Sequence, residues 1–422
     1  MTAVPLRWAG PVRPGAESGP KESPPLSIYV HLPWCLRKCP YCDFNSHEWR
    51  EGARTVPEEA YLDALQADLE SSLPSIWGRS VQTVFIGGGT PSLFSAQSVA
   101  RLLALIRSRV RLAPDAEITL EANPGTFEVE RFTGYRDAGV TRLSIGVQSF
   151  SDRALAAIGR VHDATQARAA VDLARRVFES FNVDLMYALP GQSLEDLQAD
   201  LDEAIGRGAP HLSCYHLTLE PGTAFAKRPP VLPDDDLAAD MQGAVEAACL
   251  RAGLRRYEIS AFALPGHRCR HNLNYWEFGD YLGIGAGAHG KLSFSRRIVR
   301  QSRLRHPLRY MEALAGASNG LDAGPPDPAD AAMIAAAWME EVRSVGAQDL
   351  PFEFMLNALR LTEGVPVSSF ANRTGLTEMA IAPARLRAEA RSLLVADDPA
   401  RLRPTELGLR FLSDLQGMFL PG

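Results

Sequence analysis

Three of the six cysteines lie within eight residues, in the segment Cys35-Leu-Arg-Lys-Cys39-Pro-Tyr-Cys42. Thiolates are the usual ligands of iron–sulfur clusters, and a cubane of four irons takes one ligand per iron. Cysteines at C-x3-C-x2-C spacing therefore predict a 4Fe-4S cluster that is bound from a single loop. The fourth iron is left without a protein ligand, so a chelating small molecule can bind there. In a reducing compartment this spacing favours metal binding over disulfides.

Structural zinc is the alternative for the same loop. Zinc in structural sites takes four protein ligands, and His31 or His47 could supply the fourth. The remaining cysteines are scattered along the chain. Cys214 falls in a strand pattern and Cys249 in a helical pattern, which predicts that both are core residues. Cys269 is not explained by either pattern.

The elements that must position this loop are strands and helices that alternate along the chain. Between residues 27 and 253, six short apolar runs alternate with amphipathic stretches, which predicts an α/β fold with a parallel sheet. Six strand–helix units indicate a partial (β/α)6 TIM-type barrel with one open side and a site at the carboxyl ends of its strands. The predicted strands are Ser27–Leu32, Val81–Ile86, Glu117–Glu121, Arg142–Val147, Asn182–Tyr187 and His211–Leu217. The predicted helices are Pro57–Leu73, Ser95–Val110, Phe127–Ala138, Thr165–Phe178, Leu194–Gly206 and Asp234–Ala252.

These patterns divide the chain into four parts. Residues 1–25 are rich in proline and glycine and predict a disordered tail, and residues 26–253 form the barrel. Residues 254–317 predict an extension that contains strands, and residues 331–422 predict a mainly helical C-terminal domain that resembles a winged helix.

Three features are expected within the last two parts. Leu254–Ala263 reads as one strand, and Gly283–Gly290 reads as a close-packed turn beside the cluster site rather than a dinucleotide-binding loop. Phe352–Arg360 and Thr405–Leu415 read as helices of the C-terminal domain.

Composition narrows the class of protein. With 46% hydrophobic and 22% charged residues and no apolar run long enough for a membrane span, the chain reads as a cytoplasmic protein not integral to a membrane. The net charge of -6 argues against bulk nucleic-acid binding. One stretch, Arg296–Arg309, carries six arginines. It is either a solvated basic face or a patch that meets carboxylates or phosphates of a ligand or partner.

The cysteine loop, with Tyr41 just before its last cysteine, resembles the signature of the radical SAM superfamily. Gly87-Gly88-Gly89-Thr90 follows the second predicted strand and is similar to the glycine-rich element of that superfamily, which contacts the methionyl amino group. Backbone without side chains can approach a ligand closely. The resemblance implies that S-adenosylmethionine binds the open iron and that an electron from the cluster cleaves it.

A closer resemblance, from Tyr29 to Gly290, is to the oxygen-independent coproporphyrinogen oxidase group. It implies Tyr29 near the sulfonium and Tyr41 near the adenine, and an arginine fork for the carboxylate from Arg160. The other residues that it implies around S-adenosylmethionine are Gly88, Gly89, Thr90, Glu121, Gln148 and Asp184.

The chain departs from those oxidases directly after Cys42. They carry a fourth cysteine where this chain has Phe44, and the run from Trp34 to Phe44 resembles the HemW branch of heme chaperones. That branch typically contains His-Asn-x-x-Tyr-Trp, present here from His271 to Trp276. Imidazole is a good axial ligand for heme iron and aromatic rings can pack on a porphyrin.

This resemblance implies a heme site formed by His271, Tyr275 and Trp276. Cys269 and His267 are weaker candidates for a heme ligand. The implied function is a chaperone that delivers heme to accepting proteins and lacks coproporphyrinogen oxidase activity. The alternatives are an oxygen-independent coproporphyrinogen III oxidase and another radical SAM enzyme acting on tetrapyrroles.

Overall fold

The computed structural model describes residues 20, 22–49, 56–125, 131–318 and 337–421. Most of the predicted tail, and the start of the predicted C-terminal domain at residue 331, lie outside these ranges. The described end of the tail is held in place, because the Pro24 and Pro25 carbonyl oxygens accept hydrogen bonds from Arg79 and from the Asp280 backbone.

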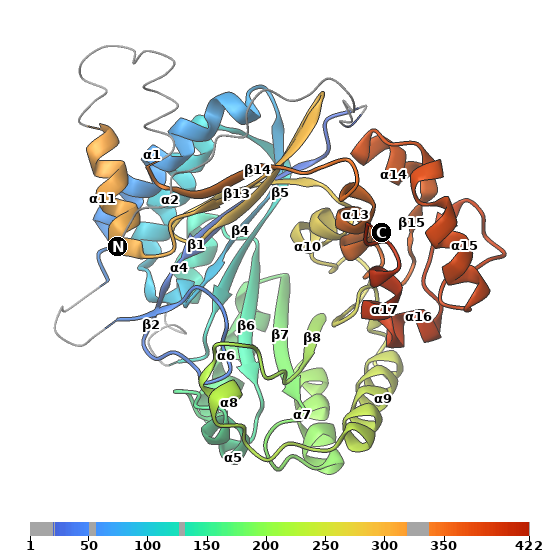
Figure 1. Ribbon diagram of the computed structural model, residues 1–422. Helices are drawn as coiled ribbons and strands as arrows, with labels where there is room; N and C mark the ends of the chain where they lie inside the picture. Colours follow the sequence, from blue (N-terminus) through green and yellow to red (C-terminus); the bar gives the residue numbers. More distant parts are fainter. Residues whose placement is uncertain (1–19, 21, 50–55, 126–130, 319–336, 422) are drawn as a thin grey trace.

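A sheet of twelve strands forms the centre of the molecule (Figure 1). Its middle strands are parallel, and among them β1, β4 and β7 are largely buried, as expected for strands covered on both faces. In sheet order they are β11 (Asp280–Ile284), β1 (Leu26–Leu32), β4 (Ser80–Gly88), β5 (Arg111–Ala122), β6 (Arg142–Gln148), β7 (Ser180–Tyr187) and β8 (His211–His216). The six predicted barrel strands are confirmed, and β11 adds a seventh beside β1.

Antiparallel strands extend both edges of this parallel region. On one side lie β12 (His289–Phe294), β13 (Arg297–Arg303) and β14 (Met339–Ser344), and on the other β10 (Ala261–Ala263) and β9 (Arg255–Arg256). The two outermost strands, β14 and β9, do not pair with each other, so the barrel stays open as predicted. The prediction of one strand over Leu254–Ala263 is wrong, because the chain turns back after Arg256 and forms two short strands.

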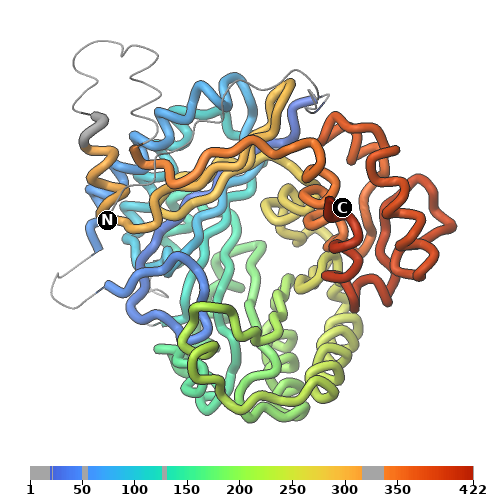
Figure 2. The backbone as a smooth tube through the Cα atoms, viewed as in Figure 1, coloured from blue at the N-terminus to red at the C-terminus, as the bar shows by residue number. Residues whose placement is uncertain are grey.

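Helices surround the outside of the curved sheet (Figures 1 and 2). Several begin at side-chain caps, for example Ser95, Asp163 and Ser193, which satisfy free backbone N–H groups. Their bounds are α1 (Glu58–Ile76), α2 (Ala96–Arg109), α4 (Phe132–Ala138), α5 (Asp152–Ala157), α6 (Ala164–Val177), α7 (Leu194–Gly206), α8 (Ala224–Lys227), α9 (Asp235–Arg251) and α11 (Pro307–Ser318). In the described part of the chain, no helix is both long and apolar enough to cross a membrane.

The C-terminal residues form a separate group of helices (Figure 2). Phe354, Phe370 and Leu415 belong to the core of this group. Its elements are α13 (Leu350–Ala358), β15 (Val365–Pro366), α14 (Val367–Thr374), η3 (Glu378–Ala380), α15 (Ala382–Ala390), β16 (Arg401–Leu402), α16 (Glu406–Arg410) and α17 (Leu412–Gly417). The prediction of one helix over Thr405–Leu415 is wrong, since the backbone breaks at Phe411. The two-stranded sheet of β15 and β16 is a feature that a winged helix also has.

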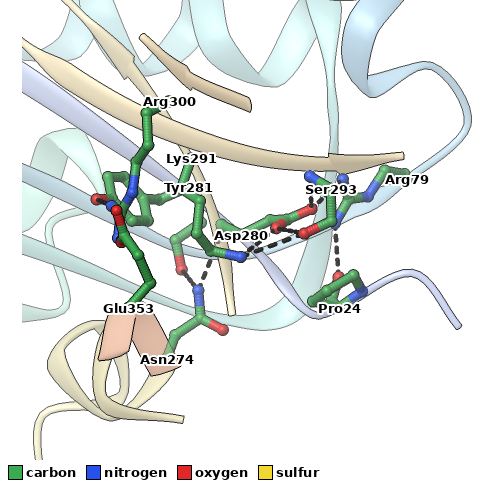
Figure 3. Close-up of polar contacts among 10 residues, drawn as sticks. Pro24, Arg79, Asn274, Asp280, Tyr281, Lys291, Ser293, Arg300 and Glu353 are labelled. Atoms are coloured by element: carbon green, nitrogen blue, oxygen red, sulfur yellow. Dashed lines mark hydrogen bonds and ion pairs between the residues drawn. The ribbon is translucent and has the colours of Figure 1, made fainter. Parts of the chain in front are cut away.

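Buried ion pairs join strands near the end of the barrel sequence to elements near its beginning. Asp280 at the start of β11 bonds Arg79, Lys291 and Ser293, and these four side chains converge in Figure 3. A second buried carboxylate, Asp68 of α1, accepts from Arg303 of β13. Breaking one partner of such a pair leaves an uncompensated charge and typically costs about 3–5 kcal/mol.

Candidate functional site

The cysteine loop begins where β1 ends and is held by a strand pairing and by packing on α1. Its first residues form β2 (Trp34–Cys35), which pairs in parallel with β3 (His47–Glu48). The Trp34 ring is buried and packs edge-on against Tyr61 of α1, with 4.7 Å between ring centroids. The backbone N–H of Cys42 donates to the Cys39 carbonyl oxygen. The loop is therefore anchored at both ends, and its three thiols lie between the anchors.

A chain of hydrogen bonds joins two of these thiols. The Thr90 hydroxyl donates to Cys35 Sγ at 3.5 Å and accepts from the Asn123 amide at 3.0 Å. Arg160 donates to Asn123 Oδ1 at 2.6 Å and to Cys39 Sγ at 3.6 Å. Thiolate ligands accept such bonds, and hydrogen bonds to sulfur tune a cluster. Thr90, Asn123 and Arg160 come from the segments that follow β4, β5 and α5.

The donor set fits a cluster better than zinc. Burial raises the pKa of Cys35 and Cys42, and the neighbouring thiols raise these pKa values further. Nevertheless, no three His, Cys, Asp or Glu side chains in the described ranges gather around a point as one metal ion requires. A cubane needs no such gathering, because each cysteine binds a different iron.

The histidines considered for zinc are otherwise engaged. His31 accepts from the Tyr29 hydroxyl at Nδ1 (3.0 Å) and donates from Nε2 to the Asn45 carbonyl oxygen (2.9 Å). Burial lowers the pKa of His31 to about 4, so the ring is neutral. His47 Nε2 lies 3.2 Å from the Arg305 carbonyl oxygen.

The glycine element packs directly on this loop. A Cβ at Gly88, where φ is +123°, would lie 2.8 Å from the His31 ring, and a Cβ at Gly89 would lie 2.5 Å from the Trp34 carbonyl oxygen. A side chain at Gly88 would collide with β1, and one at Gly89 would push the cysteine loop away from β4. Just beyond, Thr90 precedes the short helix η1 (Pro91–Leu93).

Glu121, Gln148 and Asp184 lie on neighbouring strands β5, β6 and β7, as predicted. Each is only half-buried, although the strands around it are buried. Burial, with the Asp184 charge adding to it, raises the pKa of Glu121 to about 7, although Glu121 Oε2 accepts from the Gly88 N–H at 3.0 Å. Burial also raises the pKa of Asp184, which accepts from Asn182.

Backbone strain marks the same edge of the sheet. Gln148 at the end of β6 has φ of 69°, and Ala188 just after β7 has φ of 56°. Positive φ is costly for a residue with a side chain and is concentrated at functional sites. Arg160 also keeps a buried Nε without a hydrogen-bond partner, near Tyr41, whose pKa is raised by burial. The arrangement can hold a polar ligand against the thiols.

Asn123 is a site residue to which the sequence assigned no role. It lies two positions after Glu121, so both side chains project to the same face of the strand end. That spacing is the signal that could have identified it. Its amide joins the Thr90 hydroxyl to the Arg160 guanidinium.

The predicted heme residues lie elsewhere, on helix α10 (Arg270–Trp276), which contacts β1, β4, β11 and α13. His271 is 1% exposed, and its nitrogens contact the Thr83 hydroxyl at 2.7 Å and the Tyr275 hydroxyl at 2.8 Å. Burial lowers the pKa of His271 to about 3. Thr83 lies five residues before Gly88 on β4, which is about 16 Å along a strand. The α10 set is thus separate from the cysteine loop.

Other contacts make α10 a junction between the sheet and the C-terminal helices (Figure 1). The Glu117 carboxylate of β5 accepts from the backbone N–H groups of Arg270 and His271 at the helix start. At the other end, the Arg360 guanidinium lies 4.2 Å over the centre of the Trp276 ring, which packs on the C-terminal core.

The remaining candidates from the sequence have structural surroundings. Arg300 pairs with Glu353, and Arg303 is buried against Asp68, so the Arg296–Arg309 stretch is not one solvated face. Cys214, Cys249 and Cys269 are all buried, and Cys269 Sγ faces a Glu117 oxygen at 3.7 Å. His267 Nδ1 contacts Ser180. Gly283 and Gly290 lie in strands β11 and β12, so the prediction of one turn is wrong, but the connection between these strands packs on the cysteine loop, since a Cβ at Gly287 would meet Asn45.

Comparison with known proteins agrees with this geometry. The radical SAM superfamily model matches residues 29–204, and the HemN C-terminal domain model matches residues 345–411. The chain is 46% identical to the heme chaperone HemW of Escherichia coli over 94% of this chain and 98% of that protein. It is 32% identical to HemW of Bacillus subtilis over 93% and 99%.

The fold is similar to the solved structure of coproporphyrinogen III oxidase (HemN) from Escherichia coli, a radical SAM enzyme. The TM-score is 0.76 at 22% identity, covering 94% of this chain and 90% of that one. At this identity the likeness concerns the fold alone. The radical SAM family implies a 4Fe-4S cluster and S-adenosylmethionine, which the thiols and the strand-end residues described above suit. From near full-length identity to its members, the chain belongs to the HemW family of the radical SAM superfamily.

Proposed function

We propose that this protein is a heme chaperone, which binds heme and delivers it to other proteins in the cytoplasm. The observation that carries the proposal is the near full-length identity to proteins named heme chaperone HemW. The side chain of Phe44 supports it, because this residue stands where the porphyrinogen oxidases have a fourth cysteine and is 61% exposed.

In this proposal Cys35, Cys39 and Cys42 would hold the 4Fe-4S cluster, which would supply the electron by which radical SAM proteins cleave S-adenosylmethionine. Arg160 directs a guanidinium toward the thiols and can pair the carboxylate of S-adenosylmethionine. The other proposed contacts of S-adenosylmethionine are Tyr29, Tyr41, Gly88, Gly89, Thr90, Glu121, Gln148 and Asp184. Half-buried acids at strand ends can accept from ribose hydroxyls.

Heme is proposed to bind at α10, with His271 as axial ligand and Tyr275 and Trp276 beside the macrocycle. In the structure both His271 nitrogens are engaged, so iron ligation requires the ring to leave Thr83 or Tyr275. A chaperone must also release its cargo, and loss of one of these hydrogen bonds would lower the net affinity. We expect a dissociation constant near 1 μM, about 8 kcal/mol.

Hemin titration of the purified protein tests this function. A saturable Soret shift with unchanged iron–sulfur content is expected for the wild type, and its absence would refute the chaperone function. A His271→Ala variant with an unchanged spectrum and affinity would remove only that ligand. Catalytic conversion of coproporphyrinogen III, assayed with cluster, reductant and S-adenosylmethionine, would instead favour the oxidase alternative.

A further inference from the structure

After β8 the chain returns to the cysteine loop and forms α8, which lies beside the loop that follows β2 in Figure 1. The backbone N–H of Phe225, in the first turn of α8, donates to the Pro40 carbonyl oxygen at 2.9 Å. N–H groups in the first turn have no partner within their own helix, so this one can bond a neighbouring segment. The Tyr41 ring lies beside the Phe225 ring, with 6.5 Å between their centroids. α8 therefore contacts both residues that separate Cys39 from Cys42.

Pro40 is also contacted by the segment that follows α5. Gly159, two residues after that helix, has φ of +72°, and a Cβ there would lie 2.8 Å from Pro40 Cδ. That distance is too short for a side chain, so this packing requires glycine. Two segments that are distant in sequence, at Gly159 and Phe225, thus hold the same proline of the cysteine loop.

The Tyr41 and Phe225 rings pack on one small apolar cluster that is separate from the main core of the barrel. Both rings are half-buried. The buried members of this cluster come from α5, from the end of β7 and from the segments after β7 and β8, and they are Ala154, Ile158, Met186, Leu189 and Leu217. The Tyr41 side chain is therefore supported by packing that lies outside the cysteine loop.

Phe225 is the residue by which α8 is attached. The other three residues of this helix, Ala224, Ala226 and Lys227, are exposed. A helix of four residues is not stable by itself, so it depends on its Thr223 cap and on contacts with its surroundings. The position of the Phe225 ring and the position of the Tyr41 ring are thus linked.

We propose that Phe225 is a positioning residue for S-adenosylmethionine and that it acts through Tyr41. This inference deepens the proposed function and rests on its placement of Tyr41 at the adenine. A side chain that contacts a cofactor needs a second layer of residues to lock its rotamer, and Phe225 supplies part of that layer. Loss of the Phe225 ring would let Tyr41 move, while the three thiols would still be present to bind the cluster.

The test measures affinity for S-adenosylmethionine in the full-length reconstituted protein, from the change that it causes in the spectrum of the reduced cluster. Phe225→Ala keeps the N–H group that bonds Pro40. It should keep about four irons per chain and bind S-adenosylmethionine about tenfold more weakly. In cluster-free protein, the amides of residues 39–44 should exchange with deuterium several-fold faster. Lys227→Ala, an exposed change on the same helix, should alter none of these quantities.

A double-mutant comparison distinguishes positioning from general support of the fold. In a Tyr41→Leu background, Phe225→Ala should weaken binding by less than about twofold, because the residue through which it acts is already gone. If Tyr41→Leu binds no measurable S-adenosylmethionine, the amide exchange decides instead, with faster exchange in Phe225→Ala expected and unchanged exchange overturning the inference.

The outcomes also separate this inference from the function on which it rests. Equal weakening in the two backgrounds, or loss of iron in Phe225→Ala, would give Phe225 a structural role and overturn the inference. Unchanged affinity and unchanged amide exchange in Phe225→Ala would overturn it as well. No binding of S-adenosylmethionine by the reconstituted wild type would instead refute that part of the proposed function.

Discussion

His31 of β1 and His271 of α10 are both buried histidines that contact β4, yet their surroundings differ. His31 bonds Tyr29 and the cysteine loop at Asn45, and in that loop the Cys35 and Cys39 sulfurs accept hydrogen bonds from Thr90 and Arg160, while Arg160 Nε keeps no partner. Around His271 the polar groups satisfy one another, with Thr83, Tyr275 and Glu117 closing the set. Polar groups that hydrogen-bond one another stabilise a fold, whereas polar groups that hydrogen-bond reactive atoms such as thiol sulfurs are arranged for a ligand.

The largest expected effect is on iron content, which should depend on the cysteine loop and not on the surroundings of His271. Alanine at Cys35, Cys39 or Cys42 should reduce iron from about four per chain to near zero after anaerobic reconstitution. Cys214→Ala and Cys249→Ala are matched controls, because those thiols are buried in the core, and they should keep their iron. Equal loss of iron in the controls would show that the loop alone does not define the ligands.

His271→Ala should act on stability instead. The substitution leaves a cavity and removes partners from the Thr83 and Tyr275 hydroxyls, so we expect the free energy of unfolding to fall by about 2–4 kcal/mol. Iron content should not change. Chemical denaturation measures the loss, with His289→Ala as an exposed control that should cost less than about 0.5 kcal/mol. A near-neutral His271→Ala would contradict the closed polar set.

Glu121 offers a test by pH. Its pKa is raised by burial to about 7, so the folded protein binds this proton more tightly than the unfolded chain does. The resulting stabilisation is complete below the unfolded pKa near 4.3 and is lost as pH rises to about 7. Relative to wild type, Glu121→Gln should therefore gain stability across that window, by about 2 kcal/mol once solvent screening is allowed for. Denaturation curves of cluster-free protein that stay parallel from pH 5 to 8 would contradict this.

The smallest expected effect comes from Asn123→Ala. Without this amide, Thr90 and Arg160 lose their common partner, although Arg160 keeps the Gly146 carbonyl oxygen at 2.6 Å. Affinity for S-adenosylmethionine should fall about tenfold, or 1.4 kcal/mol, with iron content unchanged. Asn272→Ala on α10 is the control, and a similar fall there would remove the distinction between the two regions.

Much of the fold was predictable because parallel strands buried on both faces read as apolar runs, and the helices between them carry clear caps. All six barrel strands were located in this way. β11 was not, because its run Asp280–Ile284 is short and contains a charged residue and a glycine. Its partner β1 lies far away in sequence, and no local pattern encodes such a pairing.

The candidate site divides in the same way. Cysteine spacing identified the loop, and strand ends identified Glu121, Gln148 and Asp184. The hydrogen bonds of Asn123 depend on the register between β4 and β5, which the sequence does not specify. The surroundings of His271 were also hidden, since the motif predicts an imidazole beside aromatic rings but not the Thr83 hydroxyl that engages it.

The position of β1 has a consequence for biosynthesis. This first strand pairs on one edge with β4 and on the other with β11. The pairing of Leu26 with Asp280 can therefore form only after Asp280 has left the ribosome. Asn45 of the cysteine loop likewise bonds the carbonyl oxygens of Ala286 and Arg305, both made late. A nascent chain that lacks these residues exposes an unpaired strand edge and an incompletely anchored thiol loop. Cluster insertion should therefore follow translation, and stalled chains ending before β11 should not retain iron.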